Sequence, residues 1–373
     1  MNPKPASPGR AAVFTGPGRP LEIRLYPVAR PAPGRTLLKL ERSGICGTDL
    51  HIRAGRLPVP TGGLIIGHEF VGRVIELGPG RRLDGLGERL KVGDLAIACV
   101  ALPCGRCFNC RRGETASCLN FGVTYLADPG QAPHFHGGFA EYLFSPTANL
   151  VKVPAGLDPD AVAAFACAGP TVIRAFDFAG GARAGELVVV QGSGPVGLFA
   201  AAWAARAGGR VVLIGSSSHP KRLALARELG AVLTIDYRRT SEADRLQKIL
   251  RLAEKMKRGN GADLVFEASG SPAAVPEGLN LVRTLGRYVI PGQYSASGGV
   301  EIQPQLITFK AIRITGSGQY KLADIRAYLD FLRKHPDLQP LLARSVRRYR
   351  IETAERALED VAAGRVIKGV FSS

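Results

Sequence analysis

The sequence predicts an α/β protein of two domains, in which a β-rich domain precedes a domain built on a doubly wound parallel sheet. The chain has 373 residues, and because single hydrophobic cores stop growing at about 250 to 300 residues, two domains are expected. Near residue 160, short apolar runs broken by Gly and Pro give way to Ala-rich helical stretches that alternate with β-branched runs. Such alternation builds a parallel sheet with helices on both faces.

The strands of the first domain are expected within residues 11–160, where Gly and Pro mark many loops. The clearest apolar runs are 37–40, 70–77 and 95–100.

In the second domain, short β-branched runs predict buried parallel strands. They lie at 187–190, 211–214, 264–266 and 288–290.

The last 65 residues combine both kinds of pattern. They predict a strand at 312–315, helices at 322–333 and 353–363, and a short final strand within 366–371. Periodicity alone leaves open whether this tail extends the second domain or returns to the first.

Composition and charge exclude several classes of protein. Hydrophobic residues make up 46% and charged residues 21%, as in globular proteins. The formal charge of +18 is spread along the chain without a polybasic run, which argues against a nucleic-acid partner. The first ten residues lack the apolar core of a secretory signal, and no apolar run has bilayer length. We therefore expect no membrane partner and a cytoplasmic location.

A glycine motif opens the second domain. Directly after the run 187–190, residues 191–197 read Gln-Gly-Ser-Gly-Pro-Val-Gly, and an Ala-rich helix is expected at 198–206. Gly192 suits a tight turn, Gly194 a close backbone approach to a pyrophosphate, and Gly197 close packing of helix on strand. With Pro195 and Val196 between them, these residues predict a dinucleotide site at a helix N-terminus. The alternative is an ordinary strand-to-helix turn.

The second strand of that domain is expected to end without a carboxylate. Residues 215–222 read Gly-Ser-Ser-Ser-His-Pro-Lys-Arg, and either Gly215 or Ser217 occupies the usual acidic position. Ser216 and Ser217, followed by Lys221 and Arg222, suit a ribose 2′-phosphate better than free hydroxyls, which favours NADP over NAD. The alternative is that the two cations simply begin a solvated helix.

Four cysteines in one loop predict a closed metal site. Two, two and seven residues separate them, and tetrahedral all-cysteine coordination is typical of structural zinc. They are Cys104, Cys107, Cys110 and Cys118. Cys99 lies in an apolar run and is expected to be a buried core thiol.

A second, open metal site is indicated by Cys46 and His68, with Cys167 as the best candidate third ligand. Three protein ligands leave the fourth position of zinc free for substrate. Taken singly, each residue has another explanation, since Cys46 and Cys167 could be small core residues and His68 a buried histidine with satisfied hydrogen bonds.

The ordered motifs of this chain resemble those of the zinc-containing medium-chain alcohol dehydrogenases, from about residue 12 to 371. The matching segments are 44–49 (Gly-Ile-Cys-Gly-Thr-Asp), 67–69 (Gly-His-Glu) with Gly72, 92–94 (Val-Gly-Asp), the four-cysteine loop, 137–142 (Gly-Gly-Phe-Ala-Glu-Tyr), 167–169 (Cys-Ala-Gly) and the glycine motif. The resemblance implies a chaperonin-like (GroES-like) catalytic domain over 1–165, a Rossmann domain over 166–308, and a return to the catalytic domain over 309–373.

The resemblance also implies roles for individual residues. Cys46, His68 and Cys167 would hold a catalytic zinc and the four-cysteine loop a structural one. Glu69 would approach the metal during ligand exchange, and Asp49 would orient the ligand histidine.

Three further residues take roles by the same resemblance. Thr48 and His51 match the hydroxyl and imidazole of a proton relay, and Lys368 matches a basic residue that reaches the cofactor pyrophosphate.

The activity that the resemblance implies is hydride transfer between an alcohol, or the matching aldehyde or ketone, and NAD(P). We expect a small-molecule substrate and a homodimer or homotetramer. Segments 78–91 and 125–136 depart from the better-known members of the family, and His134 and His136 could line an entrance, although surface histidines in loops usually have no function. Two other functions remain: a zinc-free enal or quinone reductase of the same fold, and a protein that keeps the fold and zinc without turnover.

Overall fold

The computed structural model describes residues 8–60, 62–293, 295 and 297–373 and divides into two compact units. Unit 1 comprises the chain up to Cys167 together with Gln319–Ser373, and unit 2 comprises Ala168–Gly318. The second boundary therefore lies at 318/319 and not at the expected 308/309. The reason is that the strand at Arg313–Gly316 pairs in parallel with its predecessor and completes the sheet of unit 2.

Unit 2 is built on a six-stranded sheet in which every neighbouring pair is parallel. Its order is β12-β11-β10-β13-β14-β15, the order of Rossmann domains. A ligand crevice is expected between the parallel neighbours β10 and β13, where the order in which strands are added to the sheet reverses. The strands are β10 (Leu187–Gln191), β11 (Arg210–Gly215), β12 (Ala231–Asp236), β13 (Ala262–Glu267), β14 (Val282–Ile290) and β15 (Arg313–Gly316).

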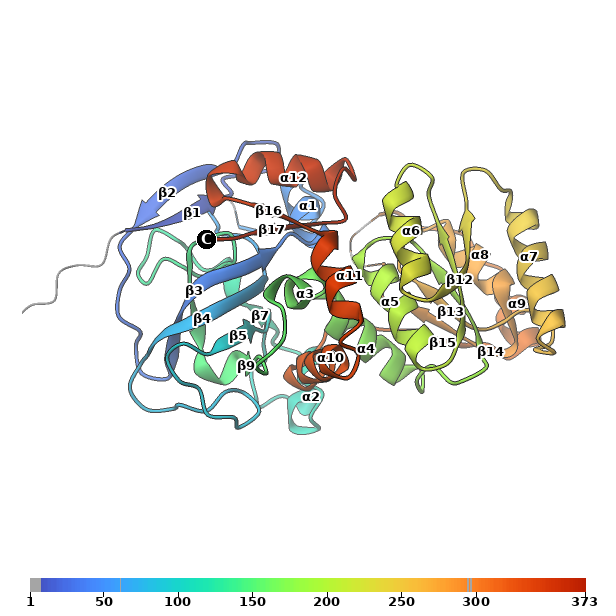
Figure 1. Cartoon of the computed structure of the whole chain (residues 1–373), viewed down its shortest axis with the longest axis horizontal. Helices are drawn as coiled ribbons and strands as arrows, with labels where there is room; N and C mark the ends of the chain where they lie inside the picture. Colours follow the sequence, from blue (N-terminus) through green and yellow to red (C-terminus); the bar gives the residue numbers. More distant parts are fainter. Residues whose placement is uncertain (1–7, 61, 294, 296) are drawn as a thin grey trace, which may run out of the picture. The chain divides into compact units, whose positions relative to one another are not determined.

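Helices cover both faces of this sheet (Figure 1). One face carries α4 (Ala168–Phe178), α5 (Pro195–Arg206) and α6 (Pro220–Glu228), and the other carries α7 (Glu242–Lys255), α8 (Ala274–Leu281) and α9 (Pro304–Lys310). Small alanines along α5 are almost all buried, which lets this helix pack closely on the strands.

A buried carboxylate anchors the amino end of this sheet. Asp263 is 1% exposed and accepts hydrogen bonds from the Leu187 amide at 2.8 Å and from Arg258 and Arg283. Burial alone would raise the pKa of Asp263, but the two arginines and the amide lower it below its ordinary value. The ionised carboxylate therefore joins β10, β13 and β14 electrostatically.

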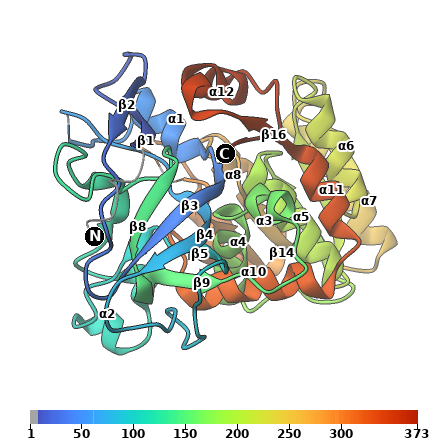
Figure 2. The same cartoon turned by 60° about the vertical axis from the view of Figure 1, so that its left-hand side comes forward.

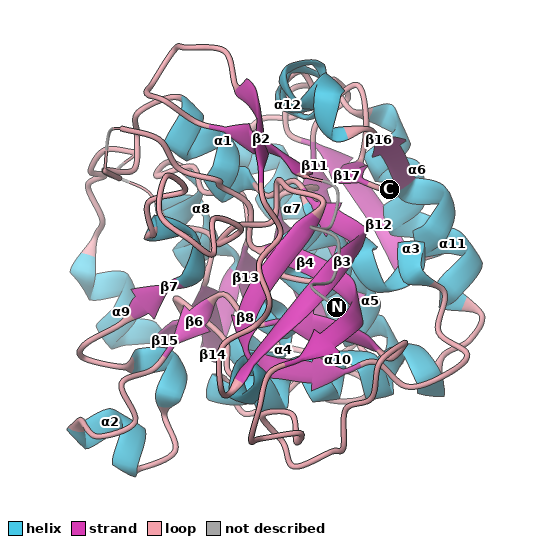
Figure 3. Ribbon diagram, turned by 90° about the vertical axis from the view of Figure 1, so that its left-hand side faces the viewer, coloured by secondary structure: helices cyan, strands magenta, loops and turns pink. Residues whose placement is uncertain are grey.

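Unit 1 contains a mostly antiparallel seven-stranded sheet. Figure 3 shows its long strands β3 and β4 as broad arrows near the centre of the view. Its order is β16-β17-β3-β4-β5-β9, with β8 pairing β3. The strands are β3 (Arg35–Gly44), β4 (Glu69–Leu77), β5 (Leu95–Ala98), β8 (Tyr142–Pro146), β9 (Leu150–Lys152), β16 (Val346–Tyr349) and β17 (Lys368–Phe371), and a separate hairpin joins β1 (Gly9–Val13) to β2 (Glu22–Tyr26).

The C-terminal segment adds helices α10 (Leu322–Lys334), α11 (Leu338–Ser345) and α12 (Ala354–Ala362) to unit 1. It ends with β17, which pairs antiparallel with β3. Figure 2 shows α12 near α1 (Gly47–Arg53), and an ion pair between Arg53 and Glu355 links these helices. The chain end thus returns to the segment that carries the expected zinc ligands. Among the described residues, no helix is long and apolar enough to cross a membrane.

Candidate active site

Three strand ends of unit 1 meet at one point of the sheet. Gly44, the last residue of β3, pairs with Glu69 at the start of β4, and Val370 of β17 pairs with Gly44 from the other side. Cys46 follows β3 directly as the N-cap of α1. Residues distant in sequence are therefore gathered here by strand register, because paired residues on neighbouring strands lie about 5 Å apart.

The predicted ligands lie together at this point. One ligand atom each from Cys46, His68, Glu69 and Cys167 can be chosen so that all four lie within 4.8 Å of one another. His68 and Glu69 are buried, and both cysteines are partly buried. Two thiolates and one imidazole form a donor set that zinc uses in catalytic sites, and Glu69 is near enough to be an alternative ligand. The residues present thus fit a zinc ion with one exchangeable position.

The thiol of Cys46 and the imidazole of His68 shift each other's pKa. A hydrogen bond from Cys167 is the main reason why the pKa of Cys46 falls well below its ordinary value, and His68 adds an attractive charge. Burial would lower the pKa of His68, but the neighbouring Cys46 thiolate raises it to about 9. A thiolate is thus stable here, and thiolate is the form of cysteine that binds metal.

Asp49 lies directly behind the ligand histidine. Its Oδ2 accepts a hydrogen bond from the Cys46 amide at 2.8 Å, and its Oδ1 lies 3.8 Å from His68 Nδ1. Within the described residues, both of these facing atoms are buried without a hydrogen-bond partner. Burial raises the pKa of Asp49 to about 6, although His68 opposes this. A small rotation would join the two atoms, which would fix the imidazole with its other nitrogen toward the cysteines.

Lys368, the expected pyrophosphate contact, lies beside Glu69. Its side chain is 2% exposed, forms an ion pair with Glu69, and donates a hydrogen bond to the Ile45 carbonyl at 3.0 Å. The ammonium is thus held beside the cluster of predicted zinc ligands in unit 1, and its contact with the cofactor pyrophosphate stays a prediction. Gly44 makes the pair sterically feasible, since a Cβ there would lie 1.9 Å from a Glu69 oxygen and 2.9 Å from Lys368 Cε.

The two expected relay residues lie on α1, three positions apart and therefore on one face of the helix. Thr48 Oγ1 is 3.7 Å from Cys46 Sγ, which places the hydroxyl beside the cluster of predicted zinc ligands. His51 is half-buried, and burial followed by repulsion from Arg56 lowers its pKa. His51 is accordingly neutral near pH 7 and able to accept a proton.

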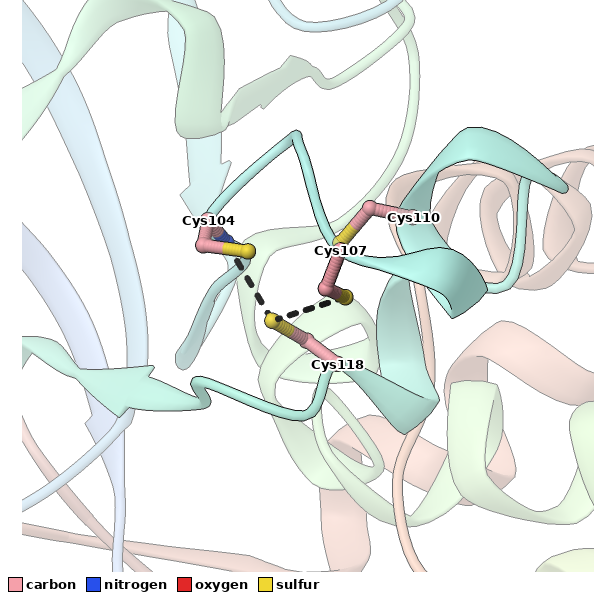
Figure 4. Close-up of side chains that lie close together, drawn as sticks. All are labelled: Cys104, Cys107, Cys110 and Cys118. Carbon is pink, nitrogen blue, oxygen red and sulfur yellow. Dashed lines mark hydrogen bonds between the residues drawn. The ribbon is translucent and has the colours of Figure 1, made fainter.

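The four-cysteine loop forms its own cluster around α2 (Phe108–Arg111) and the turn Thr115–Ser117 (Figure 4). Ligand atoms of Cys104, Cys107, Cys110 and Cys118 lie within 4.8 Å of one another. The amides of Cys104 and Asn120 each donate to Cys118 Sγ at 3.3 Å, and hydrogen bonds led by the Arg106 amide lower the pKa of Cys104 to about 6. Amides directed at sulfur stabilise thiolates, as a closed zinc site needs.

Other residues noted in the sequence lie outside these clusters. Burial raises the pKa of Cys99 to about 12, so it is a protonated core thiol. His134 stacks on Tyr26 with ring centroids 5.1 Å apart, and burial lowers the pKa of His136. Tyr125, which the sequence did not single out, is 7% exposed, and its ring centroid lies 6.1 Å from that of His68.

The glycine motif of unit 2 has the expected geometry. Gly192 has a φ of +109°, and a Cβ there would lie 2.8 Å from the backbone of Ala268. At Gly197 a Cβ would lie 2.0 Å from the Gly192 carbonyl oxygen, whereas at Gly194 it would meet nothing within 4 Å. Pro195 and Val196 form the first turn of α5. The first and third glycines thus serve close packing, and the second leaves open space at the helix N-terminus, where phosphate binds.

The turn after β11 lies at the same end of the sheet. Ser216 is buried, Ser217 and Arg222 are half-buried, and Lys221 is exposed at the start of α6. Neither β12 nor the position of Asp236 at its end was predicted from the sequence. Asp236 Oδ1 accepts a hydrogen bond from the Ser217 amide at 3.1 Å. The run Val-Leu-Thr-Ile at 232–235 was the available signal, because its β-branched residues are typical of a strand.

Family models match both units. The alcohol dehydrogenase GroES-like domain matches residues 32–155, and the zinc-binding dehydrogenase domain matches residues 195–334. The chain is 36% identical over 368 residues to 5-exo-hydroxycamphor dehydrogenase from Pseudomonas putida, covering 98% of both chains. It is 31% identical to L-threonine 3-dehydrogenase from Pyrococcus horikoshii, covering 97% of both chains.

Solved structures agree with these matches. An alcohol dehydrogenase from Thermotoga maritima superposes with a TM-score of 0.89 at 29% identity, covering 98% of this chain and 100% of that one. A zinc-binding dehydrogenase from Sinorhizobium meliloti 1021, bound to NADP, gives a TM-score of 0.82 at 28% identity, covering 99% of this chain and 100% of that one. The predicted fold class is confirmed, and the chain belongs to the zinc-containing medium-chain alcohol dehydrogenase family, whose members transfer hydride between an alcohol and a nicotinamide cofactor.

Proposed function

We propose that this protein is an NADP-preferring dehydrogenase of secondary alcohols with an apolar body, with one catalytic and one structural zinc ion per chain. The observation that carries the proposal is the buried cluster of Cys46, His68 and Cys167, with Glu69 beside it. A zinc-free reductase of this fold would have no use for two thiols and an imidazole within 4.8 Å of one another.

The residues of α1 would move the alcohol proton. When bound, zinc would supply Lewis-acid polarisation of the substrate oxygen, and the nicotinamide would accept the hydride. Thr48, beside Cys46, would hold the substrate hydroxyl and take over its proton. His51 would receive that proton at the solvent side of the helix, since its lowered pKa keeps it neutral near pH 7. Asp49 would keep His68 oriented throughout.

The substrate class is inferred from the relatives and from one side chain. The names of two relatives, 5-exo-hydroxycamphor dehydrogenase and L-threonine 3-dehydrogenase, indicate substrates whose reacting hydroxyl is on a secondary carbon. The relative named for hydroxycamphor is 36% identical over 98% of this chain, and the matching L-threonine 3-dehydrogenases are 31 to 35% identical. Tyr125 adds a buried aromatic ring beside His68. An aromatic ring beside the predicted zinc ligand His68 favours a substrate with an apolar ring system over an amino acid.

The cofactor preference follows from the turn after β11. Either Gly215 or Ser217 takes the position where an NAD-selective domain carries an acid, Ser216 lies between them, and Lys221 and Arg222 follow. The Sinorhizobium neighbour that is bound to NADP shares the fold at 28% identity. A charge-assisted contact to a phosphate contributes about 1.5 to 3 kcal/mol, which corresponds to roughly a tenfold to hundredfold preference.

The experiment is a substrate screen combined with metal analysis. We expect two zinc ions per chain and NADPH formation with a bicyclic or monocyclic secondary alcohol, with lower kcat/KM for L-threonine, sorbitol and benzyl alcohol. Chelation should remove turnover. Activity that survives complete loss of zinc, or reduction of enals and quinones only, would refute the proposal in favour of a zinc-free reductase. Two bound zinc ions with no turnover on any alcohol or ketone would indicate a fold-sharing zinc protein.

Assembly and location form the remaining part of the proposal. We expect a cytoplasmic homodimer or homotetramer, which sedimentation velocity and cell fractionation would test.

A further inference from the structure

We propose that Arg238 is a specificity-determining residue, whose guanidinium binds the ribose 2′-phosphate of NADP together with the hydroxyl of Ser218. This inference rests on the proposed preference for NADP. It concerns a residue that follows the third strand of the sheet in chain order, whereas the sequence motif for cofactor choice follows the second.

The strand register places the two segments together. β11 and β12 are parallel neighbours, and Gly215 pairs with Asp236 at their carboxyl ends. The turns that follow these residues, 216–219 and 237–240, therefore leave the same edge of the sheet, the edge at which this fold binds its cofactor. The Tyr237 amide also donates to the Gly215 carbonyl at 3.0 Å, so the pairing continues past the last strand residue.

Asp236 fixes both turns with one carboxylate. Its Oδ1 accepts hydrogen bonds from the Ser217 amide at 3.1 Å and the Arg238 amide at 3.0 Å. A hydrogen bond from the Ser217 side chain is the main reason why the pKa of Asp236 lies below its ordinary value, and the amides of Ser217 and Arg238 lower it further. Its Oδ2 lies 3.5 Å from Arg239 Nε. Oδ1 is therefore taken up by the amides of both turns, Oδ2 faces Arg239, and the cations around this one acid still suit a phosphate.

Arg238 is held over the turn by its side chain. Its Nη1 donates a hydrogen bond to Ser218 Oγ at 2.9 Å, and both residues are exposed. The Ser218 amide in turn donates to Ser216 Oγ at 3.1 Å, which ties this pair to the buried serine. A guanidinium has five N–H donors in a fixed fork, and phosphate oxygens match that geometry. The serine hydroxyl proton remains available for the same phosphate.

The local charge agrees with a dianionic ligand. Segments 215–222 and 236–239 carry Lys221, Arg222, Arg238 and Arg239 against the single acid Asp236, a formal charge of +3 from four cations and one anion. Arg239 serves as the matched comparison, because it is the next residue, its side chain is 81% exposed, and it contacts Asp236 rather than a serine of the turn. General attraction would involve both arginines, whereas a specific contact involves Arg238.

The test compares Arg238→Gln and Arg239→Gln with the wild type, using fluorescence titration of NADPH and NADH and kcat/KM for NADP and NAD. We expect Arg238→Gln to weaken NADPH binding roughly ten- to hundredfold and NADH binding less than twofold. Arg239→Gln should change both less than threefold. Arg238→Lys should recover part of the NADPH affinity, because it keeps the charge without the fork. Ser218→Ala should also weaken NADPH selectively, and its effect should overlap with that of Arg238→Gln in the double variant.

The possible results distinguish a failure of the Arg238 contact from a failure of the proposed NADP preference. A wild type that prefers NADPH, with the preference intact in Arg238→Gln, overturns this inference and leaves the proposed function standing on Lys221 and Arg222. Equal losses in the Arg238 and Arg239 variants also overturn it, since they indicate unspecific attraction. A wild type that binds NADH as tightly as NADPH overturns the cofactor preference itself and this inference with it.

Discussion

Replacing Lys368 by Met tests whether this lysine chiefly compensates the buried Glu69 or chiefly binds the cofactor pyrophosphate. In Lys368→Met, Glu69 keeps its buried position but loses the ammonium with which it forms an ion pair. Removing one partner of a buried ion pair costs about 3 to 5 kcal/mol, because the remaining charge has lost its compensation. For a domain of this size we expect Tm to fall by roughly 6 to 20 °C.

The pH dependence of this loss has a definite sign. Burial already raises the pKa of Glu69 to about 7 against the attraction of Lys368, and loss of the lysine raises it further. An acid whose pKa is higher in the folded than in the unfolded state destabilises the fold increasingly as pH rises above the unfolded value. The stability difference between the variant and the wild type should therefore be larger at pH 8 than at pH 6. It should also be larger in metal-free protein, where no cation replaces the ammonium.

The assay is thermal unfolding by circular dichroism, with and without chelator, together with a titration of NADPH. The control Lys368→Met/Glu69→Gln removes both charges and should recover most of the loss, to within about 1 kcal/mol of the wild type. NADPH affinity should stay within twofold in both variants. An unchanged Tm combined with at least a tenfold weaker NADPH complex would show that the lysine serves the pyrophosphate, and the reasoning from the ion pair would be refuted.

Three further predictions concern the metal clusters, the relay and the sheet of unit 2. Cys46→Ser should abolish turnover while the circular dichroism spectrum is retained. Cys104→Ser should chiefly lower Tm, because a closed zinc site stabilises its loop. Metal analysis should show the loss of one zinc ion per chain in each variant. Thr48→Ala should lower kcat at least tenfold with the NADPH dissociation constant unchanged, and His51→Gln should lower kcat less, since water can replace a group at the solvent end. Asp263→Asn should cost about 2 kcal/mol at pH 7 in urea unfolding. The difference should start to shrink only below about pH 4, because a carboxylate with a lowered pKa contributes stability above its unfolded pKa that is lost as pH falls through the folded value.

Each of these has a contrary result. Retained turnover in Cys46→Ser at full zinc content would remove this cysteine from the metal site. A kcat for Thr48→Ala equal to that of the wild type would remove the hydroxyl from the relay. A stability loss in Asp263→Asn that does not shrink as pH falls through the lowered pKa of Asp263 would mean that packing, and not the charge of this carboxylate, is what the substitution disturbs.

The sequence by itself determined the features that depend on residues close together in the chain. The strand, the glycines at 192, 194 and 197 and the following helix are contiguous, so their order alone identifies a dinucleotide-binding turn. The spacing of Cys104 to Cys118 is equally local, and the structure brings all four sulfurs together. Local motifs of this kind need only the conformation of one turn or loop to acquire their geometry.

Only the tertiary structure decided which distant residues share a site. Cys46, His68 and Cys167 could each have been a core residue, and strand register together with the packing of unit 1 brings them within 4.8 Å. Lys368 lies 201 residues after Cys167 and 300 after His68. It reaches Glu69 because β17 pairs with β3, a pairing that no local pattern encodes. The strand at 313–316 joined unit 2 for the same reason, since parallel pairing with β14 depends on the whole sheet.

Asp236 and Arg238 show the same limit at the cofactor turn. The turn at 216–219, after β11, contains no acid. A carboxylate from Asp236 and a guanidinium from Arg238, at the end of the neighbouring strand β12, contact this turn. Parallel strands bring their carboxyl ends to one edge, whatever length of helix separates them in the chain. Sequence therefore determines the chemical groups available for a site, and the pairing of strands determines which of those groups face the same ligand.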